Sequence, residues 1–269
     1  MRIGYLQFCP QFGEVEGNLR RARELLGDKR ADLWVLPELF STGYQFISRA
    51  EAQRLAEPVP TGPTTRALLA WARERDCYFA AGLAELTRQG VYNSAVLVGP
   101  EGLLLLYRKA HLFHREKEHF LPGDTGFQVA EVGGGKVGLL VCFDHLFPEA
   151  ARTLALKGAQ LIAHPANLVL PGLAQLTMRV RALENRVFTV TANRVGEERR
   201  GDEVLKFTGQ SQIVSPRGEV LASSGEDVEE AVTVEVELGE ATDKQITPFN
   251  HLFSDRRVDL YELCQGKGG

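Results

Sequence analysis

Short apolar runs alternate with amphipathic segments along the chain, and this alternation predicts a mixed α/β fold. Runs of strand length, several of them bounded by Gly and Pro, predict strands over residues 2–9, 32–37, 78–83, 94–98, 103–107, 136–142, 161–164, 187–192, 207–214, 219–222 and 231–236. Apolar positions at helical spacing predict helices over residues 17–26, 148–157 and 173–185, and another after the cap segment 61–64.

No internal repeat, linker or shift in composition divides the chain. We therefore expect one α/β domain over residues 1–238, followed by a C-terminal tail over residues 239–269. The run from Leu33 to Pro37 is almost continuously apolar, which is typical of a strand covered on both faces. The stretch 109–126 is polar, aromatic and irregular, so we interpret it as a functional loop.

Composition and charge narrow the classes of partner. The chain has 269 residues, 44% of them hydrophobic and 25% charged. Its net charge is -4, and its acidic and basic residues are interspersed, with no block of basic residues. Nucleic acid and anionic membranes are therefore not expected as partners. No apolar run reaches the roughly 20 residues that cross a bilayer, and the first residues lack a signal-peptide pattern, so we expect a cytoplasmic protein. The four cysteines form no CxxC pair and are too scattered for a disulfide framework.

Three side chains that could take part in catalysis each follow an apolar run. Glu38 comes after the second predicted strand, among apolar and aromatic neighbours that would raise its pKa, as a general base requires. A solvated position at the rim is the alternative. Lys109 follows another strand and is either exposed or directed into a cleft. Cys142 ends a strand just before a predicted helix, where the helix N-terminus and a nearby cation would favour the thiolate.

Together these residues resemble the nitrilase superfamily of carbon-nitrogen hydrolases. The resemblance covers nearly the whole chain and rests on residues 3–7, 37–38, 107–109, 111–113, 120–123, 142–144, 147–149, 181–185 and 209–211. Three ordered motifs are far more specific than any one alone. The resemblance implies a four-layer α-β-β-α sandwich, catalysis without a cofactor, and a homodimer or larger homo-oligomer.

The resemblance also implies a Glu-Lys-Cys triad. Cys142 would be the nucleophile and Glu38 the general base that takes its proton. Lys109, together with the backbone N–H of Phe143, would stabilise the oxyanion that develops on the substrate.

A second Glu in the loop after the lysine is implied as well, with a role in orienting the substrate or Lys109. Glu116 fits best by spacing, and Glu118 is the alternative. Four more side chains lie on or near the motif loops and either contact the substrate or pack the loops together: Tyr44, Phe113, His145 and Asn167. Aromatic groups around a dry cavity would suit a compact substrate.

No metal site is expected. The candidate ligands form no complete set at zinc spacing; they are Cys142, His145, His111, His114 and Glu118. The triple glycine at 133–135 lacks a phosphate-binding pattern and predicts a turn. Of the remaining cysteines we expect Cys9 and Cys77 in the core, and Cys264 in the tail without a role.

The implied function is hydrolysis of small amides or carbamoyl compounds through a cysteine thioester. Cys142 is followed by Phe143 and Asp144, whereas nitrile-hydrolysing branches of the superfamily typically have Trp-Glu there. This favours an amidase; an aliphatic nitrilase and a non-catalytic binding subunit are the alternatives. The partners expected are a small-molecule substrate and a second copy of the chain, because apolar residues between 244 and 262 favour contact with another subunit. Packing on the same subunit is the alternative for this tail.

Overall fold

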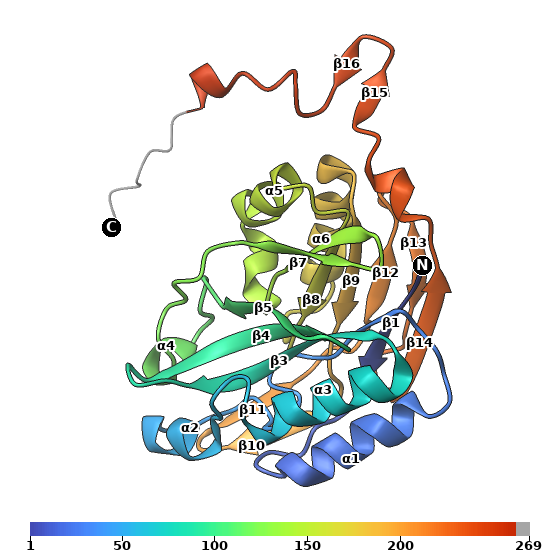
Figure 1. Ribbon diagram of the computed structural model, residues 1–269. Coiled ribbons are helices and arrows are strands. Elements are labelled where there is room, and N and C mark those ends of the chain that lie inside the picture. The colour runs from blue at the N-terminus through green and yellow to red at the C-terminus, as the bar shows by residue number, and fades with distance from the viewer. Residues whose placement is uncertain (262–269) are drawn as a thin grey trace.

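Two six-stranded sheets form the centre of the protein. The computed structural model describes residues 1–261 (Figure 1). The first sheet has the order β14-β1-β2-β3-β4-β5, in which β1, β2 and β3 are parallel and the flanking strands are antiparallel. Its strands are β1 (Arg2–Gln7), β2 (Leu33–Val35), β3 (Tyr78–Leu86), β4 (Val91–Gly99), β5 (Gly102–Arg108) and β14 (Glu230–Glu235).

The second sheet repeats this arrangement. Its order is β13-β12-β9-β8-β7-β6, with β7, β8 and β9 parallel in the centre and antiparallel strands at both sides. Its strands are β6 (Val129–Val132), β7 (Gly135–Leu139), β8 (Leu161–Pro165), β9 (Phe188–Ala192), β12 (Gln212–Val214) and β13 (Val220–Ser223). Each sheet thus has a parallel centre whose strands are joined by helical crossovers.

Four helices cover the outer faces of the sheets (Figure 1). Helices α1 (Val15–Leu26) and α3 (Pro63–Arg75) pack against the first sheet, and α5 (Pro148–Leu156) and α6 (Leu173–Asn185) pack against the second. The predicted four-layer α-β-β-α sandwich is therefore confirmed. Among residues 1–261, no helix combines the length and the apolar character that a bilayer crossing requires.

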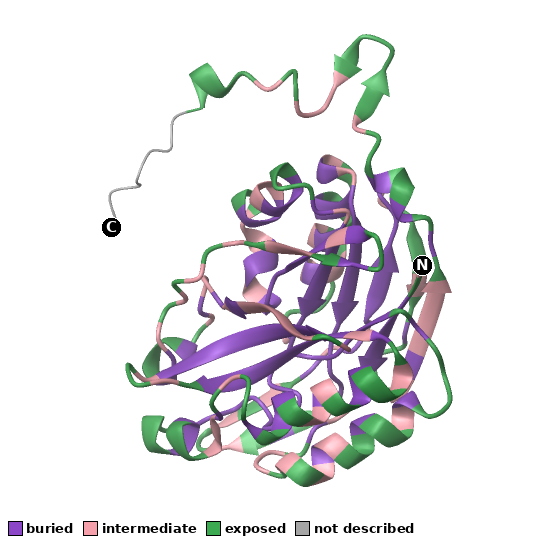
Figure 2. Ribbon diagram, viewed as in Figure 1, coloured by how far each residue is buried: buried purple, intermediate pink, exposed green. Residues whose placement is uncertain are grey.

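The position of strand β2 between two apolar layers explains why its sequence is apolar at every position. Leu33 and Val35 belong to the core between the two sheets, together with residues such as Leu139 and Ala163 of the second sheet. Trp34 points to the opposite face and packs beneath α1 and α3. Figure 2 shows the central strands of both sheets as buried, with intermediate or exposed residues on edge strands such as β14 and exposed residues on the outer sides of the helices. A strand covered on both faces loses the usual alternation of apolar and polar residues.

Several short elements were not predicted from the sequence. Helix α2 (Arg49–Leu55) and strand β6 (Val129–Val132) lie in segments for which we predicted no element, and the one-turn helix α4 (Glu116–His119) interrupts the stretch that we interpreted as a functional loop. The hairpin of β10 (Glu197–Arg200) and β11 (Glu203–Lys206) consists mostly of charged residues and lacks the alternating apolar pattern of a half-buried strand.

The predicted strand over 207–214 is wrong in its first half. Only Gln212–Val214 forms a strand, because Gly209 and Gln210 have φ values of 56° and 53°. This left-handed backbone is incompatible with an extended strand.

The tail leaves the body of the protein after the short 3₁₀ helix η2 (Leu238–Ala241) (Figure 1). It forms a small hairpin of β15 (Gln245–Thr247) and β16 (Asn250–His251), then a 3₁₀ turn over Val258–Leu260. The division of the chain near residue 238 stays a prediction. Cys264, which we expect to have no role, lies outside the described residues.

Candidate active site

The candidate site lies where strands of both sheets end. Glu38 follows β2, Cys142 follows β7 and Asn167 follows β8, and these are central parallel strands of the two sheets. Lys109 follows directly after β5. The carboxyl ends of parallel strands share one edge of a sheet, and the amide of Asn167 donates a hydrogen bond of 2.8 Å to the carbonyl oxygen of Glu38. The site therefore joins the two sheets.

Lys109 lies between two buried carboxylates. Its Nζ atom is 2.7 Å from Oε1 of Glu38 and 2.8 Å from Oε1 of Glu116. Burial acts to lower the pKa of Lys109, but Glu116 and Glu38 outweigh burial and raise the pKa above its ordinary value. The ammonium group therefore keeps its charge in a dry environment, and the exposed strand-end position that we left open for Lys109 is wrong.

Glu38 is fixed through its backbone and through one carboxylate oxygen. Oε1 accepts a hydrogen bond of 2.7 Å from Nδ2 of Asn93 in addition to the one from Lys109. A Cβ atom at Gly82 would lie only 2.5 Å from the Cα atom of Glu38, so glycine in β3 permits this close approach. Burial raises the pKa of Glu38, as predicted, although Lys109 acts in the opposite direction.

The second carboxylate oxygen of Glu38 is free to act. Oε2 is buried and has no hydrogen-bond partner among residues 1–261. An unpaired buried oxygen is costly, so its retention points to a chemical task. The solvated rim position that we left open for Glu38 does not apply, because the side chain is fully buried.

Glu116 is the second carboxylate at the lysine, whereas Glu118 is exposed and pairs with Arg115. Oε1 of Glu116 accepts a hydrogen bond of 2.7 Å from the hydroxyl of Tyr44, and Oε2 accepts one of 3.2 Å from the backbone N–H of Phe113. The one-turn helix α4 brings Glu116 to this position.

Cys142 begins the 3₁₀ helix η1 (Cys142–Leu146) in a left-handed conformation, with a φ of 44°. Its Sγ atom lies 3.7 Å from the carbonyl oxygen of Asn167. Burial and Glu38 raise the pKa of the thiol well above its ordinary value, and Lys109 offsets them only in part. The expectation that the position favours a thiolate is therefore wrong, because burial and the negative charges of Glu38 and Glu116 together outweigh the positive charge of Lys109.

Two residues absent from our sequence-based site hold η1 in place. Asp144 accepts hydrogen bonds from the hydroxyl of Tyr107 at 2.7 Å and from the backbone N–H of Val141 at 2.9 Å. Nε2 of His164 lies 2.8 Å from the carbonyl oxygen of Cys142, which can only accept, so this nitrogen carries the proton. Buried polar residues at the ends of apolar runs are the sequence signal that could have indicated both.

A third buried polar residue, Glu198, holds the backbone at Tyr44 in the same way. Both carboxylate oxygens of Glu198, in β10, accept hydrogen bonds from the backbone N–H of Tyr44, at 3.1 and 3.2 Å, and one accepts from the backbone N–H of Gln45 at 2.6 Å. Glu198 is paired in turn with the fully buried Arg194. Glu198 thereby connects the unpredicted hairpin to the cluster around Lys109.

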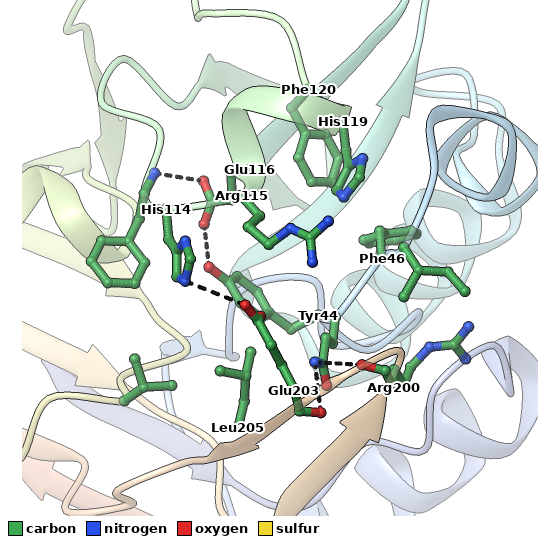
Figure 3. A pocket seen from close by; sticks show the side chains of 14 residues that line it. Tyr44, Phe46, His114, Arg115, Glu116, His119, Phe120, Arg200, Glu203 and Leu205 are labelled. Carbon is green, nitrogen blue, oxygen red and sulfur yellow. Dashed lines mark hydrogen bonds and ion pairs between the residues drawn. The ribbon is translucent and has the colours of Figure 1, made fainter.

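Two small cavities adjoin the cluster. The first, here called the thiol cavity, is lined mainly by apolar residues around Cys142, including Phe143, Leu146, Leu168 and Leu173. The second, the aromatic cavity, is shown in Figure 3 and is bordered by Tyr44, Glu116, Phe46, Phe120 and Glu203. Phe113 and Val169 line both cavities, which places the two side by side.

The four predicted pocket residues divide between these cavities. Tyr44 lines the aromatic cavity, His145 and Asn167 line the thiol cavity, and Phe113 lines both. Nδ1 of His145 lies 2.6 Å from the hydroxyl of Thr177, and burial lowers the pKa of His145 to about 3, so the ring is neutral at pH 7. Among residues 1–261, no three His, Cys, Asp or Glu side chains are grouped so that they could hold a metal ion.

Curated proteins similar to this chain are named nitrilases and amidases. A nitrilase of Pyrococcus abyssi is 49% identical over 264 residues, which cover 97% of this chain and 99% of that protein. An (R)-stereoselective amidase of Pseudomonas sp. is 40% identical, with 84% of this chain and 82% of that protein covered. An N-carbamoylputrescine amidase of Solanum lycopersicum is 32% identical, with 97% and 93% covered.

Solved structures and a family model give the same result. A carbon-nitrogen hydrolase of Helicobacter pylori G27 is 27% identical and superposes with a TM-score of 0.85 over 97% of each chain. A mutant amidase of Nesterenkonia sp. AN1, described after Michael addition of acrylamide at its active-site cysteine, is 27% identical with a TM-score of 0.75 and covers 91% of this chain and 96% of its own. The carbon-nitrogen hydrolase model matches residues 2–245, so the chain belongs to the carbon-nitrogen hydrolase family, as its resemblance to the nitrilase superfamily predicts.

Proposed function

We propose that this protein hydrolyses small amides or carbamoyl compounds through a covalent thioester on Cys142. The observation that carries the proposal is the position of Lys109, a fully buried cation held between two carboxylates and close enough to Cys142 to influence the pKa of the thiol. Such an arrangement supplies a base, a nucleophile and a positive charge in one dry site.

The first step is attack of the sulfur on the substrate carbonyl carbon. Because the resting thiol is protonated, its proton must leave as the C–S bond forms, and the unpaired Oε2 of Glu38 is available to accept it. The raised pKa of Glu38 makes its carboxylate a stronger base than an exposed one. The carbonyl π electrons move onto oxygen and produce a tetrahedral oxyanion.

The oxyanion requires donors that are already in place. Lys109 supplies a positive charge. The backbone N–H of Phe143 donates no hydrogen bond to any of residues 1–261, which leaves it available as a second donor. Donors fixed before the reaction need no reorganisation when charge develops, and removing one such donor typically costs about 100-fold or more in rate.

The remaining steps return the enzyme to its resting state. Glu38 gives the proton it took to the leaving nitrogen, the C–N bond breaks, and ammonia or an amine departs. Glu38 then removes a proton from a water molecule that attacks the thioester, and the sulfur leaves with a proton as the acid is released. Glu116 positions Lys109 throughout, since it accepts one of the lysine's two hydrogen bonds to carboxylates.

Nitrile hydrolysis is the second candidate, and it is favoured by the name of the 49% identical Pyrococcus abyssi relative. A nitrile would give a planar thioimidate on the same sulfur and would need a proton at nitrogen. An amide instead gives the tetrahedral oxyanion that Lys109 and Phe143 can stabilise. This match, with Phe143 and Asp144 after the nucleophile, supports the amidase.

The test compares kcat/KM for amides and nitriles that share a carbon skeleton, with released ammonia as the readout. We expect each amide to be hydrolysed faster than its matched nitrile. The intact mass of the protein, measured during turnover, should contain an acyl adduct that is absent from Cys142→Ala. A consistent preference for the nitriles would replace the amidase with the nitrilase, and no turnover of either class would favour a non-catalytic binding subunit.

A further inference from the structure

We propose that the thiol cavity takes the leaving nitrogen of the substrate as an unsubstituted NH2 group, with Asn167 and His145 as its hydrogen-bond acceptors. This inference rests on the proposed function and narrows its substrates to amides that lose ammonia rather than an amine. The size of the cavity, the hydrogen bonds of the two side chains and the charges around them support it.

The thiol cavity has room for one small group. Its volume is about 20 Å³, and about 10–15 Å³ is enough for a single water molecule. An NH2 group is about as large as a water molecule, whereas an alkyl substituent on the nitrogen would need more room than the cavity offers. The same volume suits the water molecule that attacks the thioester after ammonia has left.

Asn167 contributes the first acceptor. Its Nδ2 atom donates a hydrogen bond of 2.8 Å to the carbonyl oxygen of Glu38, which can only accept, and this bond fixes which end of the side-chain amide is the oxygen. Oδ1 is buried and has no hydrogen-bond partner among residues 1–261. The backbone carbonyl oxygen of the same residue lies 3.7 Å from Sγ of Cys142. An unpaired acceptor therefore lies in a residue beside the nucleophile, and an N–H of the substrate can satisfy it.

His145 contributes the second acceptor. The hydroxyl of Thr177 donates to the carbonyl oxygen of Leu173 at 3.0 Å, so in its contact of 2.6 Å with Nδ1 of His145 the ring nitrogen is the donor. Burial is the main reason that the pKa of His145 is lowered to about 3, and the ring is neutral at pH 7. A neutral ring that carries its proton on Nδ1 has a lone pair on Nε2. For the part of the chain that the structure describes, this nitrogen has no hydrogen-bond partner.

The charges around the cavity select a neutral donor. Its lining, within residues 1–261, contains no Lys, Arg, Asp or Glu. Apart from the reacting thiol, no side chain of this lining offers a free donor to a carbonyl oxygen, because Nδ2 of Asn167 and Nδ1 of His145 are engaged. An ammonium group would find no negative charge there. The reacting amide is therefore oriented with its NH2 group in the thiol cavity and its oxygen toward Lys109 and the backbone N–H of Phe143.

The test compares two ligands of the same shape, hexanamide and 2-heptanone, which carry an NH2 or a methyl group on the same carbonyl carbon. We expect Cys142→Ala, which lacks the nucleophile, to bind hexanamide about tenfold more tightly in calorimetry, as one or two net hydrogen bonds would give. Adding His145→Asn should remove most of this preference, because Asn can keep the contact with Thr177 but places no acceptor where Nε2 lies.

Thr177 offers a matched pair of variants that keeps the test decisive if His145→Asn does not fold. Thr177→Val has nearly the same shape but no hydroxyl to hold the proton on Nδ1, so it should weaken the preference as well. Thr177→Ser keeps the hydroxyl and should retain the preference. In the wild type, kcat/KM for hexanamide should exceed that for N-methylhexanamide by about 100-fold, because the methyl group lacks room and leaves an acceptor unpaired.

Binding and turnover together separate this inference from the proposed function. A preference for hexanamide that depends on His145, without hydrolysis by the wild type, would support the NH2 subsite and reject the proposed activity. Hydrolysis of hexanamide with no binding preference over 2-heptanone, or with a preference that survives both His145→Asn and Thr177→Val, would overturn the subsite and keep the activity. Neither hydrolysis nor a binding preference would overturn both.

Discussion

The hydroxyl of Tyr44 and the ammonium of Lys109 donate to the same oxygen, Oε1 of Glu116, at 2.7 and 2.8 Å. Two residues 65 positions apart, Tyr44 and Lys109, thus meet at one carboxylate. Both donors compete for its electron density, so each limits how strongly Glu116 attracts the other. Glu198 holds the backbone of Tyr44, so the position of Lys109 depends on a hairpin remote in the sequence.

Removal of the Tyr44 hydroxyl should therefore affect catalysis more than binding. In Tyr44→Phe, Glu116 loses one donor and Lys109 moves toward it, away from the position of the oxyanion. We expect kcat to fall about tenfold, which corresponds to a loss of about 1.4 kcal/mol in the transition state, with a much smaller change in KM. Steady-state kinetics with the best amide substrate measure this split. A rise in KM at constant kcat would instead assign Tyr44 to substrate binding alone.

Replacement of Cys142 should abolish turnover while the fold remains intact. The thiolate formed during attack is the proposed covalent nucleophile, so Cys142→Ala should lose activity by several orders of magnitude. Cys77→Ala is the matched control: Cys77 is buried in the core beneath α3, and its replacement should cost stability but not kcat. More than about a tenth of the wild-type rate in Cys142→Ala would exclude covalent catalysis at this residue.

His164 should make the stability of the fold fall in mild acid. Burial lowers its pKa in the folded protein to about 4, whereas an unfolded histidine titrates near about 6.5. Between these values only the unfolded state binds the proton, so the contribution is complete above about pH 6.5 and is lost as the pH falls toward 4. The loss is on the order of 3 kcal/mol.

The matched variant is His164→Gln, whose side-chain amide can still donate to the carbonyl oxygen of Cys142 but does not titrate. Denaturant unfolding from pH 7 to pH 4 should give a steeper loss of the free energy of unfolding for the wild type than for the variant. Equal slopes for the two proteins would contradict the assignment of a neutral, buried imidazole.

We propose that the tail contacts a second subunit. Phe249 is 92% exposed in the single chain and Ile246, Val258 and Leu260 are half exposed or more, although all four are large apolar residues. A truncated protein that ends at Asp243 should therefore sediment as a smaller assembly than the full chain, at equal protein concentration. An unchanged mass per particle for a folded truncated protein would reject the tail as a major interface.

Short motifs made the centre of the site predictable. Glu38, Lys109 and Cys142 each follow an apolar strand: Glu38 and Cys142 follow central strands of the two facing sheets, and Lys109 follows the edge strand β5 of the first sheet. Glu116 was predictable from spacing in the resemblance, but its contact with Tyr44 joins two loops that no local pattern connects. The same holds for Glu198, since it lies on a charged hairpin without strand periodicity.

The direction in which the pKa of the Cys142 thiol shifts was not predictable, for a different reason. A helix N-terminus and a lysine near Cys142 both favour a thiolate, and both are visible in the sequence. The sign depends on how many carboxylates the fold brings to the same place and on how far water is excluded. These quantities emerge only when Glu38, Glu116 and Cys142 are packed together.

If Cys142 acts as the proposed nucleophile, a thiol that stays protonated until a substrate binds has consequences for how long the protein remains active. Peroxides and alkylating agents react with thiolates, so a buried Cys142 with a raised pKa is shielded from oxidation to sulfenic and sulfinic acids. Cys9, by contrast, is a free cysteine that is only partly buried. Under the proposed mechanism, oxidation would therefore begin at a thiol that takes no part in the reaction, and the protein would remain active after its first oxidative modifications.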